Sequence, residues 1–69
     1  MDKDEIVRGL LQNPKSEKLH RKFLDLSKSD RNYVMYYVSL EEMGTGLPSE
    51  DFNVFWNFVK GVNNGSQSN

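Results

Sequence analysis

Apolar residues recur at helical spacing in four successive segments of this chain, and residues that start or stop helices stand between the segments. An α-helix brings residues three and four positions apart onto one face, so this spacing indicates four amphipathic helices. The sequence therefore predicts an all-α fold, a single small domain in which about four short helices form a helical bundle. The predicted helices cover residues 2–12, residues 15–26, a segment that ends before Gly44, and residues 50–62.

Proline and short polar residues mark the predicted helix ends. Pro14 disfavours a helical conformation of the residue before it, so the first helix should stop at Asn13. Asn13 can then cap the second helix, with Pro14 at its first position. Ser27 and Ser49 are suited to accept hydrogen bonds from the free N–H groups at the starts of the third and fourth helices.

The segment from Arg31 to Gly44 is rich in tyrosine and valine, which favour strands, so a strand competes with a helix here. As a helix, the segment gathers its apolar side chains on an arc of roughly 120°. Gly44 stands where a terminating glycine is expected, and no nearby segment offers a second strand. We therefore predict a helix whose rings join those of the last helix in a common apolar seam. The arc comprises Tyr33, Tyr36, Tyr37, Leu40 and Met43, and Val34 and Val38 widen it.

Residues 63–69 at the end of the chain are polar, unlike the predicted helices before them. Residues 63–69 include no apolar side chain that a core could bury. Such segments do not gain enough from burial to offset the entropy of ordering. We therefore expect residues 1–62 to form the helical domain and residues 63–69 to be a disordered tail.

Composition limits the classes of protein to which this chain can belong. It holds no cysteine and a single histidine, so we expect no disulfide, no metal and no cofactor. A domain of 69 residues has little interior, so good packing or a second copy of the chain must supply its stability. The charged start is unlike a secretory signal, and no apolar stretch approaches the roughly 20 residues of a membrane span. We expect a cytoplasmic protein that does not enter membranes.

The third and fourth predicted helices are apolar over about half of their circumference, wider than an ordinary surface helix. Either they are the central pair, covered by the other two, or part of their apolar surface stays exposed to a partner. The residues least easily covered are Met35, Val54 and Phe58. Methionine and phenylalanine are enriched in the cores of interfaces, and Val54 and Phe58 widen the apolar face of the last helix.

These features lead to the main functional hypothesis. We predict a small intracellular protein-binding or regulatory protein that presents this helical surface to another protein or to a second copy of itself. Compact helical proteins of this size occur among accessory and mobile-element proteins, which is an analogy at the level of the fold. A purely structural domain, with all its aromatic residues in the core, is a further possibility.

A DNA-binding regulator is the alternative. Residues 15–31 hold six basic and three acidic residues, and two helices joined by a short turn there could form a helix-turn-helix. However, the turn lacks the glycine that is common in this motif, and the net charge of −1 is unlike that of a basic DNA-binding domain. The candidate nucleic-acid residues are Lys15, Lys18, Arg21, Lys22, Lys28, Arg31 and Asn32.

No pattern indicates catalysis or a small-molecule substrate. His20 stands beside an apolar stripe without an evident partner, so we interpret it as a boundary residue. Glu41 and Glu42 are adjacent, and adjacent side chains on a helix point about 100° apart, so they form no acid/base pair. We expect that the protein is not an enzyme.

Overall fold

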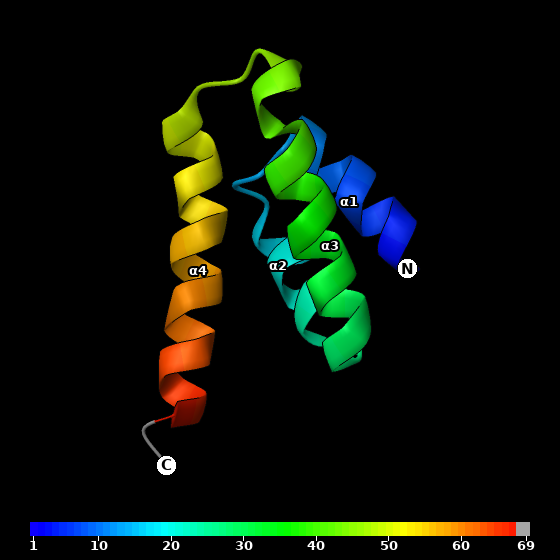
Figure 1. Ribbon diagram of the computed structural model, residues 1–69, viewed down its shortest axis with the longest axis vertical. Helices are drawn as coiled ribbons and strands as arrows, with labels where there is room; N and C mark the ends of the chain where they lie inside the picture. Colours follow the sequence, from blue (N-terminus) through cyan, green and yellow to red (C-terminus); the bar gives the residue numbers. More distant parts are fainter. Residues whose placement is uncertain (68–69) are drawn as a thin grey trace.

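The computed structural model describes residues 1–67, together with the side chains of residues 1–63. Within that range it contains helices and no strand (Figure 1), so the predicted all-α fold is confirmed, including a helix over the tyrosine-rich segment. The elements in chain order are α1 Lys3–Gln12, α2 Glu17–Leu24, α3 Lys28–Glu41, the 3₁₀ helix η1 Glu42–Thr45, and α4 Ser49–Gln67.

The last helix is longer than its apolar pattern indicated. It continues from residue 62 to Gln67 because neither proline nor a left-handed residue interrupts it in the described range. From the sequence, residues 63–69 are expected to be disordered. The side chains of residues 64–67, and residues 68–69 entirely, lie outside the described residues. That expectation stays a prediction.

Side-chain caps fix most of the helix starts. Asp2 forms a capping box with Glu5 at the start of α1, and the Ser27 hydroxyl accepts a hydrogen bond from the Asp30 N–H at the start of α3. The prediction that Asn13 caps the second helix is wrong. Ser16 caps α2 instead, because a turn at Pro14 delays the helix and places the Ser16 hydroxyl within reach of the Leu19 N–H.

The core lies between α1, α3 and α4, and α2 closes one end of it. The backbones of α1 and α3 approach each other closely, and the α3 residues that face the core are Val34 and Val38, both fully buried. The other core residues are Ile6, Val7, Leu10, Phe23, Phe52, Phe55 and Val59.

Helix α4 is held to the rest of the domain largely by aromatic rings. Its backbone comes closest to η1, and in Figure 1 its later part stands apart from α2 and α3. Ring contacts fill the space between: Phe23 meets Phe55 edge-on at 5.3 Å, and His20 stacks on Phe58 at 4.7 Å between centroids. The surplus of aromatic residues in α4 therefore acts in part as a spacer.

His20 belongs to the core, so its assignment as a boundary residue is wrong. The ring is 6% exposed, and its Nε2 lies 2.8 Å from the carbonyl oxygen of Pro14. A carbonyl only accepts, so Nε2 carries the proton and donates it. The bond fastens the turn at Pro14 to α2 while Phe55 and Phe58 cover the ring.

Candidate protein-binding surface

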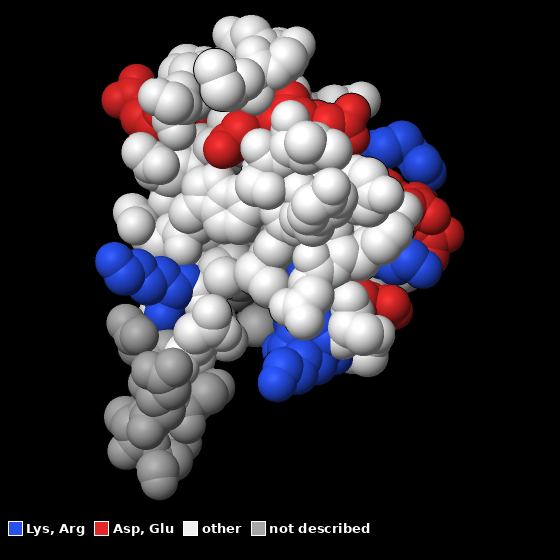
Figure 2. All heavy atoms as spheres, viewed as in Figure 1, with Lys and Arg blue, Asp and Glu red and all other residues white. Residues whose placement is uncertain are grey.

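Three large apolar side chains are exposed along one face of α3 and η1. Tyr36 is 60% exposed, Leu40 61% and Met43 92%. Their spacing of four and three residues places them in one line, which we call the α3 stripe. At about 100° per residue the stripe lies on the side of the helix opposite Val34 and Val38. Figure 2 shows an uncharged area over α3, bordered above by acidic groups near η1.

The sequence left open whether the tyrosine-bearing arc of α3 lies in the core or stays exposed to a partner. In the structure the two valines face the core, and Tyr33 and Tyr37 lie half-buried at its margin. Valine is small enough to let α1 come close, whereas a buried phenol needs a polar partner. The larger rings therefore remain at the surface.

The tyrosines form a continuous row that begins at Tyr36 in the stripe and ends at Tyr33. Tyr37 contacts Tyr33 at 4.6 Å and Tyr36 edge-on at 5.0 Å between ring centroids. The row is anchored at one end, because the Tyr33 hydroxyl donates a hydrogen bond of 2.5 Å to Asp4 Oδ1 on α1 and Lys3 lies over the ring. The hydrogen bond to Asp4 is the main cause that raises the pKa of Tyr33 to about 12.

The stripe ends at a hollow between η1 and the start of α4. The hollow has a volume of about 450 Å³, and Met43, Leu47 and Phe52 form its apolar walls. Trp56 on α4 donates a hydrogen bond of 3.0 Å from its indole N–H to Glu42 Oε2 on η1. This bond holds the two elements together beside the hollow.

The residues predicted for protein interaction lie in three different surroundings. Met35 is half-buried beside a cleft between α3 and α4, and Phe58 is half-buried against His20. Val54 is 42% exposed on α4. Sequence reasoning missed the α3 stripe, although two valines four residues apart on the opposite side were a signal for it.

The residues predicted for nucleic-acid binding lie on three consecutive segments, namely the turn before α2, α2 itself and the start of α3. Lys28, Arg31 and Asn32 line the cleft between α3 and α4. Lys15 instead pairs with Asp51 at 3.7 Å, beside the start of α4. On the face shown in Figure 2, basic groups lie in separate places with acidic groups among them. The remaining candidates lie on α2, where Lys18 and Arg21 are exposed and Lys22 is half-buried.

Three further features are absent from the described range. No group of three His, Asp or Glu side chains there could hold a metal ion. Every buried polar side-chain atom described has a hydrogen-bond partner. None of the described helices has the length and apolar character needed to cross a bilayer.

Comparisons with protein-family models, with curated proteins and with solved structures found no match.

Proposed function

We propose that this is a small protein-binding protein whose α3 stripe docks against an amphipathic helix of another protein. The observation that carries the proposal is the exposure of Tyr36, Leu40 and Met43 in one line on the side of α3 opposite its core face. Contiguous exposed apolar side chains are typical of interaction sites, whereas single ones are ordinary.

The chemistry of the stripe suits a helical partner. Anchors at positions i, i+4 and i+7 match the apolar face of a helix lying alongside. Tyrosine provides a rigid ring with a polar end, and methionine adapts to the shape of the surface it meets. Full burial of such side chains contributes roughly 1.5–3 kcal/mol each, which must exceed the entropy lost on association.

Capture from host lysate with matched variants tests the proposal. The tagged chain, a Tyr36→Ser/Leu40→Ser double variant and a Leu24→Ser control are compared. Leu24 is also exposed, but it lies on α2 away from the stripe. We expect the natural chain and the control to capture the same protein, and the double variant to bind that purified protein at least about tenfold more weakly. Equal binding by all three would contradict the proposal.

DNA binding is the second candidate, because the start of α3 presents basic groups without acidic partners. Lys28 and Arg31 form no ion pair with any residue the structure describes, and Asn32 beside them is exposed. A mobility-shift titration at several salt concentrations tests this idea. Binding through phosphates must weaken steeply as salt rises, and no shift at low salt would exclude it.

A further inference from the structure

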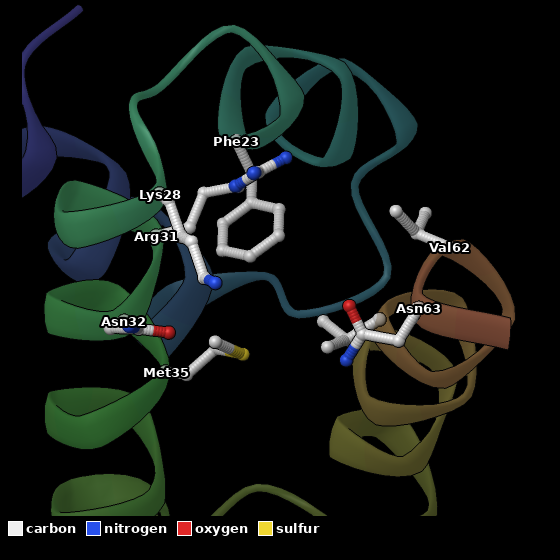
Figure 3. Close-up of a pocket in the computed structure, with 8 residues that line it drawn as sticks. Phe23, Lys28, Arg31, Asn32, Met35, Val62 and Asn63 are labelled. Atoms are coloured by element: carbon white, nitrogen blue, oxygen red, sulfur yellow. The ribbon is translucent and has the colours of Figure 1, made fainter. Parts of the chain in front are cut away.

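Helices α3 and α4 diverge away from η1, and a cleft of about 190 Å³ opens between the start of α3 and the second half of α4 (Figure 3). Phe23, Met35 and Val59 form apolar walls of the cleft, and Lys28 and Arg31 extend from α3 along one side. None of its lining residues is acidic. The cleft thus combines an apolar interior with two positive charges at its edge.

The cleft and the α3 stripe lie on different faces of α3. Lys28, Arg31 and Met35 follow one another at intervals of three and four residues, so they share one face of the helix. Leu40 of the stripe comes nine positions after Arg31, which at about 100° per residue places it about 180° away. The cleft is therefore a second surface, and binding there does not depend on what the α3 stripe binds.

The size of the cleft and the chemistry of its edge specify what it can hold. Its volume is below the roughly 300–1,000 Å³ of small-molecule sites, so it suits one protein side chain better than a cofactor. Neither Lys28 nor Arg31 has an ion-pair partner among the residues whose side chains are described. Both side chains only donate hydrogen bonds, so the group opposite them must accept. Because no acidic residue lines the cleft, this acceptor must come from the molecule that binds there.

The apolar interior favours a peptide over a nucleic acid as the source of that acceptor. A duplex would meet the two basic groups with its phosphates and leave the interior unused. Single-stranded bases bind by stacking on exposed ring faces, but Phe23 is only 2% exposed and offers no such face. An apolar side chain beside a carboxylate fits both parts of the cleft, since a guanidinium pairs strongly with a carboxylate.

We propose that this cleft binds a short acidic segment of another protein. One large apolar side chain of the segment enters the cleft, and a neighbouring aspartate or glutamate pairs with Lys28 and Arg31. Met35 adapts to the shape of the inserted side chain, as flexible thioethers do. Asn32 and Asn63 also line the cleft, and their amides can donate hydrogen bonds to the backbone of the segment.

Peptide titrations followed by NMR of the isotope-labelled full chain test the proposal. The probes are five-residue peptides with blocked ends, in which leucine, methionine or phenylalanine stands between two glutamates on each side. One control peptide has serine at the centre, and another has leucine at the centre and glutamines in place of the glutamates. We expect at least one probe to shift the signals of the cleft residues until they saturate, and both controls to bind at least about tenfold more weakly.

Matched variants assign the binding to the cleft. Lys28→Glu reverses a charge at the first residue of α3, and Lys18→Glu makes the same change in the first turn of α2, at an exposed position that does not line the cleft. Glutamate suits the first turn of a helix, so both variants should fold, which circular dichroism checks. We expect Lys28→Glu combined with Arg31→Gln to weaken peptide binding at least about tenfold and Lys18→Glu to change it less than about twofold.

Four outcomes would overturn the proposal. The first is that no probe shifts the cleft signals up to roughly 5 mM peptide. The second is equal binding of the leucine and serine peptides, which would mean that the interior takes no side chain. The third is that a DNA duplex at low salt shifts these signals and the probes do not, which would assign the basic edge to phosphates. The fourth is cleft signals that move with protein concentration alone, which would identify a second copy of the chain as the occupant.

Discussion

Val34 and Val38 let α1 lie close against α3, and this leaves the larger tyrosine and leucine side chains of α3 on the surface. The apolar character of a residue does not by itself decide its burial, because a small β-branched side chain and a phenol suit different positions. Because the two valines pack in the core, the larger rings of α3 are left on the surface. The function proposed for this chain thus originates in the size of two buried side chains.

Tyr33 offers a test of the contact between α1 and α3. The protonated phenol donates to Asp4, so the pKa is raised, and the stability this bond contributes is present below about pH 10 and lost as the pH rises through about 12. In an alkaline titration followed by phenolate absorbance, we expect one late step near pH 12. Tyr33→Phe should remove that step and Tyr36→Phe should retain it. A late step that survives Tyr33→Phe would show that the hydrogen bond is absent.

At the scale of the elements, the sequence predicts where helices occur but not how each is turned. Helical spacing, the cap at Ser27 and the break near Pro14 depend on neighbours along the chain, and the helices they predict are present. The buried face of α3 depends on what α1 presents to it, and a pattern within one segment does not contain that information. For the same reason, the α3 stripe and the cleft beside α4 were not foreseen.

Two glycines inside helices test how closely the elements pack. A Cβ on Gly9 of α1 would lie 2.9 Å from Leu19 Cδ1 of α2, whereas a Cβ on Gly61 of α4 meets nothing within 4 Å. Alanine favours a helix over glycine by about 1 kcal/mol, and overpacking costs about 1–3 kcal/mol. Urea denaturation should show that Gly61→Ala raises the free energy of unfolding by about 0.5–1 kcal/mol and that Gly9→Ala does not raise it. Equal stabilisation by both would mean that α1 and α2 are farther apart than described.

At the scale of the whole molecule, stability depends on the rings that join α4 to the other helices. A chain of 69 residues has an expected free energy of unfolding of about 3–10 kcal/mol. Phe55 is fully buried, and its ring contacts Phe23 and His20 of α2 as well as Trp56 beside it, so it joins α4 to α2. Loss of this one ring therefore threatens the entire domain.

Replacing Phe55 tests this dependence. Phe55→Ala removes a buried ring at a cost of about 3–5 kcal/mol and is expected to leave much of the protein unfolded at room temperature. Val54→Ala, at the exposed neighbouring position, should change the free energy of unfolding by less than about 0.5 kcal/mol. Thermal unfolding followed by circular dichroism measures both. Similar midpoints for the two variants would show that α4 is not held by its rings.

The hydrogen bond between Trp56 and Glu42 has a practical consequence. Trp56 is the single tryptophan of the chain, and its indole lies at the contact between η1 and α4, beside the hollow where the α3 stripe ends. The protein thus contains a built-in fluorophore at the boundary between its last helix and its exposed face. The wavelength of its fluorescence emission will report both the detachment of α4 from η1 and the binding of a ligand at the hollow, without an added dye.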